Sequence, residues 1–437
     1  MLFFTTCQKL LKFDIIKNTL NLLLYFIFYT QKINANRWPK PETTTVIYEP
    51  CQYNLPEIIE SKTVNQKTKF LLPILKWGPT NQVYGFFESA QLAHILNRTL
   101  VLPPMFAHGS AKGRYLDDIH VPVGLRTNLE VISKNQPVVS LETYKKYCPE
   151  TRTAFLTRAV PPNMMERIYQ FQDATNFTFR HFEKLEKVGP VGERNDWGPY
   201  QANSDRCVVY VLPYRSIIRP DRDILTKEAV GMPDFVIRLR DEFFAEMLKD
   251  ADPYDLPIPD FTFHWRYNKG DWSMRCKANF HKVPKECHFM KNLDDKTILK
   301  IFSNQNLNSS LTTTSKVLMY IASPPSESPF ITKLVEKLKI EHENTVYLTT
   351  KKLSDWLSDH QVRNCHYARI YNSELVSILE QAILANTKKF FPWPSSSWSG
   401  RVIQLRPEKV RMKERGFSLT DLIERSMDLE REHAEEF

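Results

Sequence analysis

The chain has 437 residues, of which 42% are hydrophobic and 12% aromatic, a composition that supports buried cores and excludes collagen-like or low-complexity proteins. Its 59 basic residues are interspersed with 50 acidic ones, so the formal charge of +9 forms no continuous basic stripe, and we expect no nucleic-acid partner. The length is that of two domains of ordinary size.

The N-terminus has the pattern of a secretory signal. Three lysines precede a short apolar run at residues 20–29, and Ala35 provides a small residue where a signal peptidase would cut. The apolar run is shorter than the roughly 20 residues that a membrane-spanning helix needs. We therefore predict that residues 1–37 are a secretory signal, with an uncleaved signal-anchor as the alternative.

Two further features fit the secretory pathway. Asn97, Asn176 and Asn308 each begin an Asn-x-Ser/Thr triplet and are candidates for N-glycosylation. Six of the seven cysteines lie beyond the predicted signal, an even number that predicts up to three disulfides in an oxidising compartment. Cys276 and Cys287 are close in the sequence, and they are the one pair that we predict.

The first predicted domain covers residues 38–255. The apolar run 70–75, the helical pattern 83–96 and the apolar run 99–104 give a strand, a helix and a strand. This order is a βαβ unit, which predicts a parallel sheet with helices on its faces. Residues 105–205 are irregular, with one strand-like run, PVVSLE.

The second predicted domain covers residues 256–406 and follows a linker rich in Pro and Asp. Strand-like runs at 261–265 and 317–322 are followed by helical patterns, including a long one through SELVSILEQAILA. Residues 407–437 are a charged C-terminal tail. Two α/β domains account for both the length and the pattern.

The segment WGPTNQ joins the first strand to the first helix. Ligands bind at this edge of open α/β sheets, and the free N–H groups of a helix N-terminus suit a phosphate. Asn81 can reach a ligand from this position, or it can cap the helix, which is the commoner role of asparagine at a helix start.

The segment FHWRYNKGDW ends the first strand of the second domain. Aromatic and polar residues alternate here, so His264 and Arg266 lie side by side on one face of the strand. Arginine can form two parallel hydrogen bonds to a phosphate. The alternative is that Arg266 pairs with Asp271 and closes a loop, and the spacing does not distinguish the two.

The segment SSSWSGRVIQLR places hydroxyl groups before a helical run. Such hydroxyls can hydrogen-bond a phosphate at the helix N-terminus, or they can cap the helix, which is the commoner use of serine.

Together, these segments resemble the GDP-fucose protein O-fucosyltransferase family. NQ and LAHILNRTLVLPP, then HWRYNKGDW, then SSSWSGRVIQLR occur in the family's order over residues 66–406. The resemblance implies an α/β, GT-B-type fold of two Rossmann-like domains facing a central cleft, with the acceptor on the N-terminal side and GDP-fucose on the C-terminal side. It also implies an inverting, metal-independent transfer of fucose from GDP-fucose to Ser or Thr hydroxyls of small disulfide-rich domains.

The resemblance also assigns roles to residues. Asn81 matches an asparagine that contacts the donor and takes part in catalysis, and Arg266 matches the arginine that holds the β-phosphate and the glycosidic oxygen. The other donor-binding candidates are Gly78, Pro79, Thr80, His264, Ser396, Ser397, Trp398 and Ser399. The implied acceptors are folded secreted domains of the epidermal-growth-factor-like or thrombospondin type. We expect a monomer in the lumen of the endoplasmic reticulum, with membrane anchoring in the Golgi as the alternative.

Two positions depart from the family's pattern. Gly78 stands where the best-known branch has an arginine, and the first loop has no carboxylate that could act as a base. Pro324 stands near the place of an acidic residue that follows a strand in the family, with Glu327 as the nearest substitute. These departures favour an alternative function, a non-catalytic fucosyltransferase-like protein that binds or chaperones secreted domains. The retained residues favour the enzyme.

Two metal-binding interpretations compete with this one. The Asp-x-Asp triplets at 221–223 and 250–252 fit a metal-dependent glycosyltransferase by letters, but the first lies at a predicted helix start and the second in the linker. The two cysteines and two histidines between residues 276 and 288 could hold zinc, although a disulfide is the commoner outcome in an oxidising compartment. We therefore expect no metal, and no cofactor beside the donor.

Overall fold

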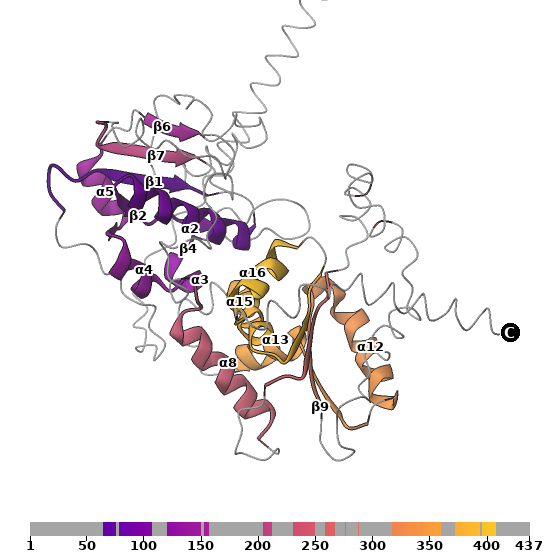
Figure 1. Ribbon diagram of the computed structural model, residues 1–437. Coiled ribbons are helices and arrows are strands. Elements are labelled where there is room, and N and C mark those ends of the chain that lie inside the picture. The colour runs from indigo at the N-terminus through magenta and orange to yellow at the C-terminus, as the bar shows by residue number, and fades with distance from the viewer. Residues whose placement is uncertain are drawn as a thin grey trace, which may run out of the picture. The chain divides into compact units, whose positions relative to one another are not determined.

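The computed structural model describes residues 64–75, 78–106, 120–149, 153–156, 204–211, 230–249, 258–266, 276, 287, 317–341, 343–359, 372–393 and 396–407 (Figure 1). All of these residues belong to one compact unit, Glu49–Phe437. The predicted signal, the linker up to residue 257, the predicted domain boundary and the tail beyond residue 407 lie outside the described residues. Within the described ranges, no helix is long and apolar enough to cross a membrane.

The first sheet has five parallel strands in the order β5-β2-β1-β7-β6 (Figure 1). Its strands are β1 (Phe70–Ile74), β2 (Thr99–Val101), β5 (Val138–Val139), β6 (Thr153–Leu156) and β7 (Cys207–Val211). Every residue of β1 is buried, which is the usual state of a central strand in a parallel sheet covered on both faces.

Helix α2 (Pro79–Ile95) connects β1 to β2 and completes the βαβ unit that the sequence predicts. Its residues from Gln82 to Ala93 are buried on all sides, because the helix contacts both the first sheet and α16 (Ser397–Leu405). The other described elements of this half are an antiparallel pair, β3 (Met105–Phe106) with β4 (His120–Val121), and the helices α3 (Val123–Arg126), α4 (Leu129–Asn135) and α5 (Leu141–Tyr147). Helix α8 (Asp234–Met247) precedes the linker in the sequence but packs against the helices α13 (Thr350–Asp359) and α15 (Asn372–Ala385) of the second half.

The second sheet has four parallel strands in the order β10-β9-β8-β11. Its strands are β8 (Phe261–His264), β9 (Val317–Ala322), β10 (Thr345–Thr349) and β11 (Lys389–Phe391). Among the described residues, the helices of this half include the short 3-10 helix η1 (Pro325–Glu327), α12 (Ser328–Glu341), α13 (Thr350–Asp359), α15 (Asn372–Ala385) and α16. Both sheets are therefore Rossmann-like, with parallel strands joined by helices.

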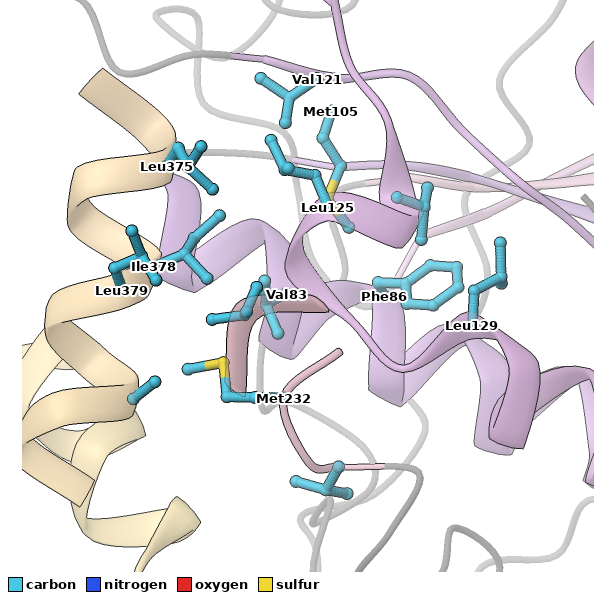
Figure 2. Packing of buried hydrophobic residues seen from close by; sticks show 14 of the residues in the cluster. Val83, Phe86, Met105, Val121, Leu125, Leu129, Met232, Leu375, Ile378 and Leu379 are labelled. Atoms are coloured by element: carbon cyan, nitrogen blue, oxygen red, sulfur yellow. The ribbon is translucent and has the colours of Figure 1, made fainter. Parts of the chain in front are cut away.

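One apolar cluster extends across the helices of both halves. Figure 2 shows Val83 of α2 and Leu125 of α3 on the side of Leu375 and Ile378 of α15, with Phe86 of α2 farther from α15, beside Leu129 of α4. Because interiors are packed as densely as organic crystals, a shift of α2 relative to α15 would open cavities in this cluster. The cluster therefore ties the first helix of one sheet to the last long helix of the other.

A buried polar network joins three elements of the second half. The backbone N–H of Ser323, after β9, donates to Thr350 Oγ1 at 2.8 Å, and Thr350 Oγ1 donates to Glu380 Oε1 of α15. Tyr320 Oη donates to the same carboxyl oxygen at 3.1 Å. Burial raises the pKa of Glu380 to about 8, against the effect of these two hydrogen bonds, so the carboxyl is largely protonated at neutral pH.

The structure differs from the sequence-based expectation in three places. The region predicted to be irregular holds β3, β4, β6, α3, α4 and α5, whose strands and helices are too short to show a clear period. In the run PVVSLE, Ser140 ends the strand and caps α5 by accepting the N–H of Thr143. Helix α13 follows β10 without a connecting loop, so no turn residue marks its start.

Candidate functional site

The three segments singled out in the sequence all follow strands at the switch points of the two sheets. In the first sheet, β1 lies between β2 and β7; in the second, β8 lies between β9 and β11. Crossover connections diverge at such positions, and ligands of open α/β sheets bind at the carboxyl ends of the strands there. The first loop follows β1, the histidine and arginine end β8, and the serine segment follows β11.

His264 ends β8 with its imidazole buried. Its Nδ1 lies 2.6 Å from Ser399 Oγ, and the backbone N–H of Trp393 donates to the same oxygen at 2.9 Å. The Ser399 hydroxyl can donate to Nδ1 or accept from it; when it donates, the neutral imidazole carries its hydrogen on Nε2. Burial, with a smaller effect of the Arg266 charge, lowers the pKa of His264 to about 3. The imidazole is therefore neutral at physiological pH.

The start of α16 combines a helix cap with a cation. Ser396 is the N-cap residue, and its Oγ accepts the N–H of Ser399 at 3.4 Å, so the capping interpretation holds for this serine. The same oxygen lies 3.5 Å from Nη1 of Arg266, whose side chain is exposed. Ser397 is the first helical residue and is half-buried. An exposed guanidinium beside a helix N-terminus is an arrangement that favours an anion.

Trp398 covers the buried histidine. The ring centroids of His264 and Trp398 are 4.2 Å apart, and the indole Nε1 donates to Ser377 Oγ of α15 at 3.0 Å. The indole is therefore held by a ring contact on one side and by a hydrogen bond on the other. Its contact also contributes to the burial that keeps the imidazole neutral.

The start of α2 leaves a polar atom for another molecule. Gly78 is the N-cap residue without a side-chain cap, Pro79 is the first helical residue, and Asn81 lies within the first turn, so the capping interpretation of Asn81 is wrong. The Oδ1 atom of Asn81 is buried, and no described residue donates a hydrogen bond to it. A buried polar atom in this state is costly unless it binds something.

Helix α15 brings the starts of α2 and α16 together. Gln381 Nε2 donates a hydrogen bond to Thr80 Oγ1 at 3.3 Å. One turn earlier in the same helix, Ser377 Oγ accepts a hydrogen bond from Trp398 Nε1. Residues four apart in a helix are separated by about 6 Å along its axis and lie on the same face. Thr80 and Trp398 are therefore neighbours along one side of α15.

The carboxyl group of Glu327 lies near the end of β8, because it shares a hydrogen bond with Trp265. Pro324 is the N-cap residue of η1, and Glu327 ends that short helix, beyond the carboxyl end of β9 and beside β8. Burial raises the pKa of Glu327, while a hydrogen bond with Trp265 opposes the shift.

The other residues singled out in the sequence do not join the site. Asn97 is exposed just beyond the opposite end of α2, in a left-handed conformation with φ of 50°. Cys276 and Cys287 are joined in a disulfide, so neither offers a thiolate to zinc. Asn176, Asn308 and Asp271 lie outside the described residues.

Sequence reasoning missed Ser377 and Gln381. Their partners lie 21 and 301 residues away along the chain, and their helix looks like an ordinary buried one because most of its residues are apolar. The available signal was the spacing of Glu374, Ser377 and Gln381, which places three polar side chains on one face of that helix.

No family model matches the chain, and no curated protein matches its sequence. Solved structures do match its fold. The crystal structure of POFUT1 in complex with GDP-fucose has a TM-score of 0.50 and 14% identity, and the match covers 79% of this chain and 96% of that one. The apo form of POFUT1 has a TM-score of 0.48, 14% identity and coverage of 82% and 97%. The fucosyltransferase NodZ from Bradyrhizobium has a TM-score of 0.35, 12% identity and coverage of 78% and 94%.

The first of these matches covers 79% of this chain, whose described residues form two parallel sheets joined by helices. The chain therefore has an α/β fold of GT-B type with two Rossmann-like halves, as the sequence predicts.

Proposed function

We propose that this protein is a fucosyltransferase that takes fucose from GDP-fucose. The observation that carries the proposal is the group formed by Arg266, neutral His264 and the start of α16 at the switch point of the second sheet. Such a group suits a diphosphate, and the fold is shared with POFUT1, which has been crystallised with GDP-fucose and with GDP. Of the residues singled out by the family resemblance, His264 lies beside Ser399 and Arg266 beside Ser396, which supports the proposal.

The proposed reaction is an inverting substitution at the anomeric carbon of fucose. The acceptor oxygen forms a bond to that carbon from the face opposite GDP. The bond to the β-phosphate oxygen breaks, and its electron pair leaves with GDP. Arg266 offsets the negative charge that develops on GDP. The acceptor hydroxyl loses its proton to solvent, directly or through a water held by Asn81.

His264 has a separate role in this proposal. A neutral imidazole with hydrogen on Nε2 donates one hydrogen bond to the donor substrate and adds no charge of its own. The hydroxyl of Ser399 fixes the ring through Nδ1, so the direction of the Nε2 hydrogen is set before the donor binds.

Asn81 is proposed to face the reacting sugar. Its buried Oδ1 can accept a hydrogen bond from a fucose hydroxyl or from the acceptor. The free N–H groups at the start of α2 add partial positive charge beside it. We propose that two helix N-termini and one arginine offset the charge of the diphosphate without a metal.

The acceptor and the compartment are also proposals. Disulfides such as Cys148–Cys207 and Cys276–Cys287 form in oxidising compartments, which supports the endoplasmic reticulum as the site of action. The family resemblance supports Ser or Thr of small disulfide-rich domains as the acceptor. We propose that the enzyme acts on them as a monomer.

Calorimetric titration of the secreted protein with GDP-fucose and with GDP, each with and without EDTA, tests the proposal. We expect micromolar affinity that the chelator leaves unchanged. Arg266→Ala should weaken GDP binding by at least tenfold, which corresponds to about 1.4 kcal/mol. Arg238→Ala, which removes an exposed arginine from α8, is the matched control and should bind as the wild type does.

Absence of binding in a folded sample would overturn the proposal and favour the non-catalytic alternative. Binding that disappears with EDTA would contradict metal independence alone. After binding is established, transfer of radiolabelled fucose to epidermal-growth-factor-like and thrombospondin-type domains identifies the acceptor.

A further inference from the structure

Helix α15 carries a row of three polar residues, Glu374, Ser377 and Gln381, here called the α15 stripe. Spacings of three and four residues place all three on one face of the helix. Glu374 and Gln381 are buried and Ser377 is partly buried. Buried polar groups cost free energy unless they are hydrogen-bonded, so packing alone does not explain the α15 stripe.

Each member of the α15 stripe binds a different element of the fold. The three contacts are Arg126 Nη2 of α3 to Glu374 Oε2 at 2.7 Å, Trp398 Nε1 of α16 to Ser377 Oγ at 3.0 Å, and Gln381 Nε2 to Thr80 Oγ1 of α2 at 3.3 Å. Two of these contacts reach the first turns of the helices that carry the candidate site. The remaining contact, between Arg126 and Glu374, reaches α3, a helix of the first half that does not belong to the site.

We propose that the α15 stripe is a positioning element that fixes the first turns of α2 and α16 relative to each other. Gln381 and Ser377 are the positioning residues for the two helix starts. The apolar cluster resists a shift of α2 along α15 because such a shift would open cavities, but apolar contacts pair no particular atoms. The hydrogen bonds of the α15 stripe are directional, so they add the pairing that holds each helix start at one place beside α15.

The catalytic consequence rests on the proposed function. Asn81 follows Thr80 directly, and Trp398 covers His264, so a shift of either helix start moves a residue that faces the donor. Small displacements of reacting groups can lower a rate by up to about a hundredfold. We infer that Gln381 controls the sugar side of the site and Ser377 controls the diphosphate side.

Hydrogen exchange measured by mass spectrometry tests the positioning without reference to activity. The variants are Gln381→Met and Ser377→Ala, and the matched control is Ser373→Ala, an exposed serine one turn earlier on the same helix. We expect about tenfold faster exchange at the start of α2, residues 79–87, in Gln381→Met, as follows from the loss of one buried hydrogen bond. Ser377→Ala should act in the same way on residues 396–405.

Unchanged exchange in both variants would overturn the proposal. Faster exchange spread evenly over the whole chain would also overturn it, because that result indicates general loss of stability. If Gln381→Met fails to fold, Gln381→Asn keeps the amide and shortens its reach by one methylene group. We expect Gln381→Asn to loosen the same segment, and normal exchange there would count against the proposal.

Kinetics of the full secreted chain test the catalytic consequence, namely that Gln381 controls the sugar side of the site and Ser377 the diphosphate side. Gln381→Met should lower kcat about tenfold and leave the dissociation constant of GDP within about twofold of the wild type. Ser377→Ala should raise that dissociation constant about fivefold. Equal kcat values for Gln381→Met and Ser373→Ala would overturn the catalytic inference. A wild-type protein that binds no GDP would instead refute the proposed function, and the exchange data would still decide whether the α15 stripe positions the two helices.

Discussion

Arg266 is exposed, so we expect its replacement to change the proposed chemistry far more than the stability of the fold. Replacing it with alanine should lower fucose transfer by at least about a hundredfold, the usual effect of removing one group that stabilises developing charge. Arg266→Lys keeps the charge but loses the two-pronged geometry, and it should recover only part of the rate. Initial rates at saturating donor measure both effects. A thermal unfolding midpoint equal to that of the wild type serves as the control, and a fully active alanine variant would remove Arg266 from the mechanism.

The buried neutral histidine predicts a loss of stability in acid. The pKa of His264 is about 3 in the folded protein and near 6.5 when unfolded, so the unfolded chain binds an extra proton between these values. The free energy of unfolding should therefore fall as the pH is lowered from about 6.5. His264→Asn, which keeps a polar partner for Ser399, should show a weaker fall between pH 6.5 and pH 4.5. Urea titrations at several pH values measure the difference, and parallel curves would contradict the assignment.

The carboxyl of Glu380 predicts that the free energy of unfolding falls as the pH rises, which is the opposite of the effect of His264. Its pKa is about 8 when folded and near 4.5 when unfolded, so here the folded protein holds the extra proton. Its stabilising contribution is complete below about pH 4.5 and is lost as the pH rises through 8. Glu380→Gln keeps an oxygen for Tyr320 and Thr350 and cannot ionise. Between pH 5 and pH 8.5 it should lose less stability than the wild type, and an equal loss would show that another group is responsible.

At the scale of elements, a buried ion pair joins α3 to α15. The side chains of Arg126 and Glu374 are 2% and 6% exposed, so removing either partner leaves a buried, unpaired charge. Arg126→Met should lower the free energy of unfolding by about 3 kcal/mol or more. Lys134→Met removes the cation from a pair on α4 whose side chains are 66% and 53% exposed, and it should have almost no effect. Chemical denaturation of both variants measures the contrast, and similar small losses would contradict it.

The elements that the sequence predicted well are those with a strong local pattern. The βαβ unit around α2 and the alternation in β8 could be predicted because each is defined within a few turns or one strand. The interpretation of Asn81 as a cap failed because Gly78 and Pro79 start the helix earlier than its apolar residues indicate. The contact from Gln381 to Thr80 depends on strand order, which no local pattern contains.

At the scale of the whole molecule, the sequence predicted two α/β halves but not how they share a core. The apolar cluster containing Val83 and Leu375 forms because helices from both sheets pack against each other, and their sequences only show that each is apolar. The pairing of β8 with β11 joins segments more than a hundred residues apart. This pairing creates the switch point at which β8 ends with His264. The candidate site therefore depends on long-range strand pairing, which brings together segments that the sequence identified only one by one.

The disulfide between Cys148 and Cys207 has a consequence for the covalent integrity of the chain. It joins the residue after α5 to the first residue of β7, with a separation of 59 residues. A protease that cuts once anywhere between these two cysteines leaves both fragments attached through sulfur. Such a nicked protein should run as a single full-size band in gel electrophoresis until a reducing agent releases two pieces, so a preparation that is pure by a non-reducing gel can still contain a cut backbone.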